Sequence, residues 1–127
     1  MTEIKAKVNG VWQGSENAFK VQLPVIIFKD DNAHIMYCPA LDLSGYGNNE
    51  DEAQKSFQVT LGEFFLYTLR KKTLESELKK LGWKLKSKHK PMTPPPMSKL
   101  LAQNVNFSNI FNNYSFRKID EAFSLPV

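Results

Sequence analysis

The acidic residues in the first half of the chain are the first candidates for chemistry: Asp30, Asp31, Asp42 and Glu50. Clustered carboxylates are what a metal-dependent nuclease needs, because they hold the cation that activates the attacking water. Their sequence context favours structural roles instead. Asp30 and Asp31 stand beside Asn32 in a turn cluster, Asp42 belongs to a solvated connector, and Glu50 opens a helix, where its charge suits the helix dipole. We therefore predict no catalytic carboxylates.

Thiol and imidazole groups are equally sparse. Cys38 is the one cysteine of the chain, and its two histidines are His34 and His89. On a strand, His34 and Cys38 would share a face but lie about 13 Å apart, too far for a base to activate a nucleophile. One cysteine without CxxC or HxxxH spacing makes no zinc site. We predict a protein that is not an enzyme, with no cofactor and no metal.

Length and composition bound the class of protein. The chain has 127 residues and 42% hydrophobic content, which suits one globular unit with a single core. A single cysteine excludes an internal disulfide and favours the cytoplasm. Residues 1 to 5 lack an apolar signal region, and no segment approaches the roughly 20 apolar residues of a membrane span. We expect a cytoplasmic protein without a membrane segment.

Basic residues are concentrated between positions 70 and 90. This stretch holds nine lysine or arginine residues and two glutamates, an excess of +7, whereas the whole chain carries +4 and the remainder therefore −3. Such a segment attracts phosphate backbones or an acidic protein face, or it is the solvated face of a helix and a strand. The first interpretation makes Lys84, Lys86, Lys88 and Lys90 nucleic-acid-binding residues.

Alternating residues predict strands in the first part of the chain. Residues 4 to 8 and 19 to 27 alternate apolar and polar side chains, and Pro24 predicts an edge, a bulge or a strand start. A turn at residues 30 to 32 then leads into residues 34 to 38, which completes an antiparallel hairpin.

A long helix is predicted next. Its apolar residues recur at spacings of three and four: Ala53, Phe57, Leu61, Phe64, Phe65 and Leu69. This stripe would lie on a sheet. Asn49 is the predicted N-cap, with Glu52 reaching back to the Asn49 amide. Residues 74 to 81 form a short helix that ends at Gly82.

The remaining segments predict an extended C-terminal part. Residues 83 to 86 alternate as a strand, and residues 87 to 96 form a proline-rich linker. Residues 97 to 103 are predicted to form about two helical turns capped by Ser98. Residues 114 to 125 are predicted to form a strand or an extended arm. We therefore predict an α+β domain at residues 1 to 90. The linker and arm, residues 91 to 127, would pack on that domain or on a neighbouring subunit.

Six residues run in a characteristic order from the hairpin into the helix: Tyr37, Pro39, Leu41, Gly47, Glu52 and Ala53. The order is a hairpin, a Pro-x-Leu element, a glycine-containing connector and a capped amphipathic helix. Over residues 24 to 85 it resembles the HicB-like antitoxin family. The resemblance implies a three- or four-stranded antiparallel sheet covered by one long helix, in a partial ferredoxin-like or degenerate RNase H-like arrangement. Asn48-Asn49 replaces the family's usual Asp-Thr, and nothing after residue 91 predicts a helix-turn-helix or ribbon-helix-helix element.

The resemblance also implies a function. HicB-like proteins neutralise a small toxin, HicA, which cleaves mRNA, and many repress their own operon. Here it implies a binding protein whose contacts with a basic HicA-like toxin are Asp42, Tyr46, Glu50 and Asp51. Two alternatives stay open: a stand-alone homo-oligomeric scaffold without a toxin, and a nucleic-acid-binding autoregulator. The apolar surface of the long helix, edge strands and tail predicts a homo-oligomer in each case.

Overall fold

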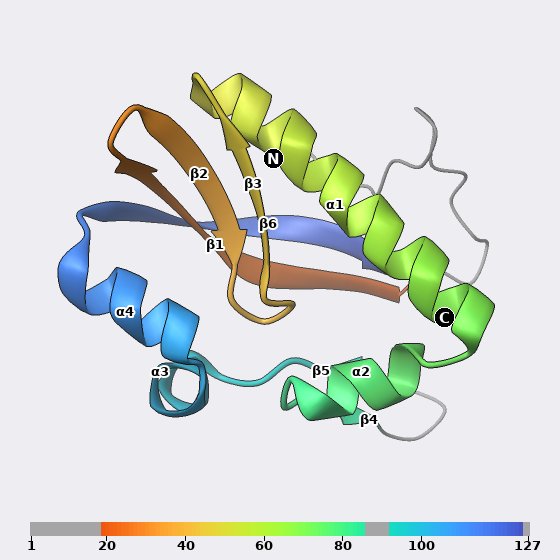
Figure 1. Ribbon diagram of the computed structural model, residues 1–127. Coiled ribbons are helices and arrows are strands. Elements are labelled where there is room, and N and C mark those ends of the chain that lie inside the picture. The colour runs from red at the N-terminus through yellow and green to blue at the C-terminus, as the bar shows by residue number, and fades with distance from the viewer. Residues whose placement is uncertain (1–18, 86–91, 126–127) are drawn as a thin grey trace.

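A four-stranded antiparallel sheet lies at the centre of the computed structural model, which describes residues 19–85 and 92–125 (Figure 1). The chain forms strands β1 (Phe19–Asp30), β2 (Ala33–Cys38), β3 (Leu43–Gly47), β4 (Lys84–Leu85), β5 (Met92–Thr93) and β6 (Phe116–Leu125), and helices α1 (Glu50–Lys71), α2 (Leu74–Lys80), α3 (Met97–Gln103) and α4 (Val105–Asn113). The predicted α+β class is therefore confirmed. The strand predicted at residues 4 to 8 lies outside the described residues.

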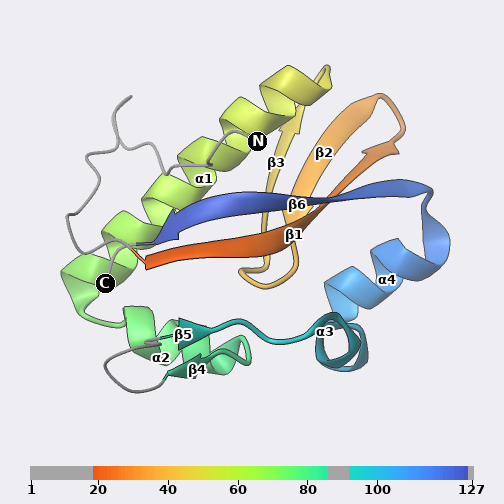
Figure 2. The ribbon, with the colours of Figure 1, turned by 180° about the vertical axis from the view of Figure 1, so that it is seen from behind.

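The strands of the sheet follow the order β3-β2-β1-β6. β1 and β2 form the predicted hairpin, in which Asp30 pairs with Ala33 across a turn whose first residue, Asp31, has a φ of 54°. β6 pairs with β1 over its whole length, from Phe28 opposite Phe116 to Phe19 opposite Leu125. Seen from behind, β1 and β6 cross the molecule side by side (Figure 2). The predicted C-terminal arm is thus a strand of this chain's own sheet.

Pro24 lies at a position in β1 where a residue without a backbone N–H is tolerated. Its register partner is Asp120 of β6, whereas the pairing of β1 with β2 begins only at Ile26. Pro24 therefore lies where the described β1 has a neighbouring strand on one side, which agrees with the predicted edge position.

β3 was not predicted, because its residues were assigned to a glycine-containing connector between the hairpin and the helix. That assignment is wrong: Gly45 and Gly47 pair with β2 opposite Met36 and His34. A Cβ added at Gly45 would lie 2.2 Å from the backbone nitrogen of Phe57. Glycine is required there because α1 rests directly on the backbone of β3.

The start of α1 follows the predicted capping with one difference. The Glu52 N–H donates to Asn49 Oδ1 at 2.9 Å, so Asn49 is the N-cap. The Glu52 carboxylate accepts from the Asn48 N–H at 3.1 Å, and not from Asn49 as predicted. Both bonds fix the angle at which the chain leaves β3.

The apolar stripe of α1 faces the sheet as predicted over most of its length. Ala53, Phe57, Leu61 and Phe65 are buried. The prediction for Leu69 is wrong, since this side chain is 44% exposed. In the last turn the buried face passes instead through Thr68, whose hydroxyl donates to the Phe64 carbonyl at 2.9 Å. A hydroxyl satisfied inside its own helix can be buried at little cost.

The segments after α1 agree only in part with the predictions. α2 ends before Gly82, which has the expected positive φ of 97°. Met92–Thr93, placed in the linker, forms β5 opposite β4. α3 follows Pro96 and has no side-chain cap, so the prediction of Ser98 as its cap is wrong.

α4 was not predicted, because its sequence is rich in asparagine. It forms because Asn104 caps it, its Oδ1 accepting from the Phe107 N–H at 3.0 Å. Phe107 and Ile110 are buried on its inner face. Tertiary packing and capping thus outweigh a weak intrinsic helix propensity.

Candidate partner-binding cleft

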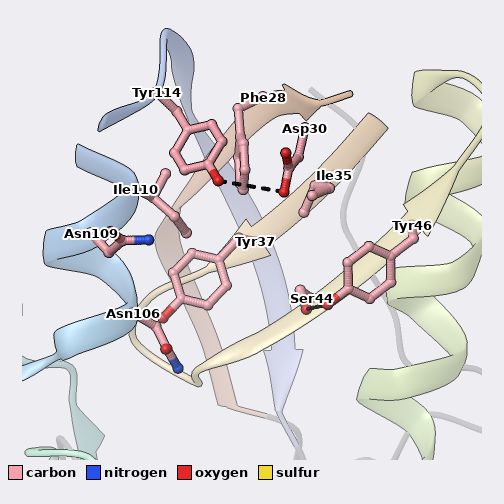
Figure 3. Close-up of a pocket in the computed structure, with 10 residues that line it drawn as sticks. All are labelled: Phe28, Asp30, Ile35, Tyr37, Ser44, Tyr46, Asn106, Asn109, Ile110 and Tyr114. Atoms are coloured by element: carbon pink, nitrogen blue, oxygen red, sulfur yellow. Dashed lines mark hydrogen bonds between the residues drawn. The ribbon is translucent and has the colours of Figure 1, made fainter. Parts of the chain in front are cut away.

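A cleft of about 330 Å³ opens between α4 and the sheet (Figure 3). Its walls come from β1, β2, β3, α4 and the residue after α4: Phe28, Asp30, Ile35, Tyr37, Ser44, Tyr46, Asn106, Asn109, Ile110 and Tyr114. Aromatic rings and amide groups predominate among them. The three tyrosine rings lie around the space between α4 and the sheet.

Strand alternation explains why the cleft lies on this side of the sheet. Side chains alternate along β3, so Gly45 and Gly47 meet α1, whereas Ser44 and Tyr46 point to the opposite face. Tyr46 pairs with Ile35, which places both side chains on that opposite face. The glycines let α1 approach closely, whereas the larger side chains of the other face keep α4 away from the strands and leave a gap.

Aromatic contacts hold α4 over the sheet. Phe107 is fully buried beneath it. The ring of Phe111 lies 5.4 Å from that of Phe116 in β6, and the ring of Tyr114 lies 5.1 Å from that of Phe28 in β1. These distances are typical of favourable aromatic pairs. The two ring pairs fix the C-terminal end of α4, and the buried Phe107 anchors its N-terminal half.

A polar network fixes the start of α4 to the turn between β2 and β3. The Tyr37 hydroxyl donates to Asp42 Oδ1 at 2.5 Å, and Asn104 Nδ2 donates to the Tyr37 oxygen at 2.9 Å. Asn106 Nδ2 lies 3.4 Å from the same Asp42 oxygen. Burial, followed by the bond to Asp42, raises the pKa of Tyr37 well above its usual value. The Tyr37 hydroxyl therefore stays protonated at neutral pH and can donate to Asp42. Asp42 itself has a left-handed backbone conformation with a φ of 53°.

The charge on the cleft is negative. Asp30 lies at its rim, where Oδ2 accepts from the Tyr114 hydroxyl at 3.4 Å, and Asp42 borders it through Tyr37 and Asn106. Among the described residues that line the cleft there is no lysine, arginine or histidine. A cationic group would therefore be favoured there over an anionic one.

The structure brings together only two of the four predicted partner contacts. Tyr46 lines the cleft with 59% of its surface exposed, and Asp42 is bonded to two residues that line it. Glu50 and Asp51 lie beyond the other end of β3, at the start of α1. Glu50 pairs with Arg117 at 3.0 Å, and Asp51 pairs with Lys55 at 3.1 Å. Glu50 and Asp51 are thus engaged in ion pairs apart from the cleft, and their role as partner contacts stays a prediction.

The structure describes one of the four lysines that were predicted to bind nucleic acid. Lys84 is exposed on β4, whereas Lys86, Lys88 and Lys90 lie outside the described residues. The other basic residues of the segment are exposed at the end of α1 and on α2: Arg70, Lys71, Lys72, Lys79 and Lys80. Lys80 pairs with Glu77 at 3.4 Å.

The residues considered for catalysis are located as follows. Cys38 is fully buried, and burial raises the pKa of its thiol to about 12, so it is not a reactive thiolate. His34 is half-buried in β2, and His89 lies outside the described residues. Within residues 19–85 and 92–125, no three acidic, cysteine or histidine side chains form a group that could hold a metal ion.

No helix in this part of the chain has both the length and the apolar content of a membrane span.

Several residues of the cleft and of its polar network were missed from the sequence: Tyr37 and Asn104 in the network, and Asn106, Asn109 and Tyr114 in the lining. The signal available for them was an asparagine-rich segment, residues 104 to 113, which is interrupted by Phe107 and Phe111 and followed by Tyr114 and resembles loop composition. Comparison of the chain with protein-family models, with curated proteins and with solved structures gave no match.

Proposed function

We propose that this protein is a HicB-like, non-catalytic antitoxin-type protein that binds and neutralises a small RNA-cleaving toxin in the cytoplasm. The cleft between α4 and the sheet is its binding surface. The observation that carries the proposal is an open cleft lined by tyrosine and asparagine side chains, with one carboxylate, Asp30, and no basic residue among its described lining residues. The resemblance of the residues from Tyr37 to Ala53 to HicB-like proteins supports the choice of partner.

The composition of the cleft suits a protein partner. Tyrosine is enriched where proteins recognise one another, because its ring supplies apolar area and its hydroxyl a hydrogen bond at low entropic cost. Tyr46 is the exposed ring, and the Ser44 hydroxyl donates to its oxygen at 3.2 Å. Tyr46 is thereby oriented before a partner arrives.

The charge of the cleft suits a toxin that acts on RNA. A protein that binds RNA carries lysine and arginine residues to neutralise phosphates. The carboxylates of Asp30 and Asp42 complement such a surface and would compete with RNA for it. Occupying the RNA-binding residues of the toxin is sufficient for neutralisation, so no chemistry is required of the antitoxin.

Co-expression with the toxin encoded beside this gene tests the proposal. The unaltered chain should restore growth of cells that produce the toxin, and Tyr46→Ala should lose this protection with at least about tenfold weaker binding, as for a central aromatic anchor. Tyr67→Ala is the matched control, because Tyr67 is 62% exposed on α1 and lies outside the cleft. Full protection by both variants would disprove a role for the cleft. A neighbouring gene product that does not cleave RNA would disprove the antitoxin assignment.

A stand-alone homo-oligomeric scaffold is the second candidate function. It is favoured by exposed apolar side chains on α4, where Val105 is 81% and Phe111 44% exposed. In that case α4 of one copy would contact another copy, and no toxin would be bound.

A further inference from the structure

We infer that the cleft receives an arginine side chain of the bound partner, which lies against the tyrosine rings and pairs with Asp30. This inference rests on the proposed function and names the group that is recognised. The occupant is a basic protein, because the described lining residues carry negative charge and no positive charge.

The shape of the cleft suits a planar cation. A guanidinium group is flat, stacks on aromatic faces and offers several donors in a fixed fork. The Tyr46 ring stands on the β3 side of the cleft, and the Tyr114 and Phe28 rings, with centroids 5.1 Å apart, form the wall near β1 (Figure 3). A lysine ammonium would gain less, since it is strongly hydrated and cannot stack.

Asp30 is the carboxylate that remains available for the cation. Asp42 already accepts from Tyr37 at 2.5 Å and from Asn106 at 3.4 Å through the same oxygen. Asp30 accepts from the Tyr114 hydroxyl at 3.4 Å through Oδ2. That bond is long, and a carboxylate has about four acceptor positions, so Asp30 retains capacity for a guanidinium fork.

The Tyr114 hydroxyl also positions the Asp30 carboxylate. By donating to Asp30 it draws the carboxylate toward the wall formed by Tyr114 and Phe28. A cation that pairs with Asp30 would therefore also lie against an aromatic face, and the two interactions reinforce one another. The amide oxygen of Asn106 on α4, whose nitrogen is directed to Asp42, supplies an acceptor for a remaining guanidinium donor.

The test is a nuclear magnetic resonance titration of the ¹⁵N-labelled full chain. The probe is a short glycine-serine peptide with one arginine, and the matched probe has citrulline, which is similar in shape but uncharged. A single side chain binds at best with about millimolar affinity, so peptide is added to several millimolar at a fixed ionic strength of about 0.15 M. The arginine peptide should shift the resonances of Tyr46, Asn106 and Asn109, and the citrulline peptide should not.

Two variants that each remove one negative charge locate the interaction. Asp30→Asn should weaken binding of the arginine peptide about tenfold, as expected for loss of a charge-assisted bond. Asp120→Asn should leave binding unchanged, because Asp120 is exposed on β6, pairs with Lys118 and does not line the cleft. Circular dichroism melting verifies that both variants fold.

The outcomes separate this inference from the proposed function. Equal binding of the two peptides, equal losses in the two variants, shifts confined to residues away from the cleft, or no shifts at all would each overturn the arginine site. The antitoxin proposal would survive such a result if Tyr46→Ala still abolished protection from the toxin. If the arginine peptide binds as described but the neighbouring gene encodes no RNA-cleaving toxin, the site stands and the antitoxin proposal falls.

Discussion

Replacing Asn104 by alanine should loosen α4 and destabilise the fold by about 2 kcal/mol. The Asn104 side chain makes two separate contributions. Its Oδ1 caps α4 by accepting from the Phe107 N–H at 3.0 Å, and loss of such a cap typically costs about 1 kcal/mol. Its Nδ2 donates to the Tyr37 oxygen at 2.9 Å, and a neutral hydrogen bond of this kind contributes about 1 kcal/mol net. Tyr37 still donates to Asp42 in the variant, so no further penalty arises from an unpaired hydroxyl.

Urea and thermal unfolding measure this loss. For a chain of 127 residues, about 2 kcal/mol corresponds to a fall in melting temperature of roughly 8 °C. The matched control is Asn113→Ala at the other end of α4. The Asn113 side chain is exposed, and its bonds to the Asn109 carbonyl and to Asn109 Oδ1, both 2.9 Å, stay within the same helix, so its removal should cost less than about 0.5 kcal/mol.

Hydrogen exchange adds a local measurement. The Phe107 amide should lose protection in Asn104→Ala, because its acceptor is the side chain that is removed. Equal melting temperatures for the two variants, together with an unchanged Phe107 amide, would refute the role assigned to the network between α4 and the β2–β3 turn.

Four further outcomes are expected. Asn49→Ala should cost about 1 kcal/mol through loss of the α1 cap, and an unchanged melting point would mean that the helix begins elsewhere. Gly45→Ala should lower the free energy of unfolding by about 1–3 kcal/mol, as is typical of overpacking, because the added Cβ would lie 2.2 Å from a backbone nitrogen of α1. An unaltered urea midpoint would contradict this close approach. Between pH 9 and 12 stability should fall, because the Cys38 thiol ionises at its usual pKa of 9.0 in the unfolded chain, whereas burial raises its pKa to about 12 in the fold. Cys38→Ala should show a shallower fall of stability in unfolding measured across this pH range, and an equally steep fall would refute this role of the thiol. Light scattering at tens of micromolar should give a mass above that of a 14.5 kDa monomer, whereas the monomer mass would exclude the oligomer.

The parts of the fold that the sequence predicted are those with strong local signals. The hairpin has turn residues between two alternating runs, and α1 has both a cap at Asn49 and a regular apolar stripe. The end of α2 is marked by Gly82, whose φ of 97° favours glycine. Each of these signals acts within a few residues, so no tertiary information is needed to read it.

The parts that were missed depend on contacts distant in sequence. Glycine is a weak strand former, and β3 becomes a strand because β2 pairs with it and α1 requires the space above Gly45. α4 is stabilised by the burial of Phe107 and Ile110. The cleft depends on both missed elements, since residues of β3 and of α4 line it. It also joins Asp30 of β1 to Tyr114, which is 84 positions away. No local pattern brings these two residues together.

The pairing of β6 with β1 determines when the molecule can complete its fold during synthesis. β1 is made early, but β6, its partner over residues 19 to 28, emerges from the ribosome only after all four described helices. Until then Leu23 and Val25, which are fully buried in the finished protein, have no neighbouring strand from β6. Pairing between segments so far apart is intrinsically slow and leaves apolar surface exposed in the meantime. A growing chain therefore exposes these apolar side chains of β1 until translation has passed residue 125, and the fold is complete only when the last strand docks.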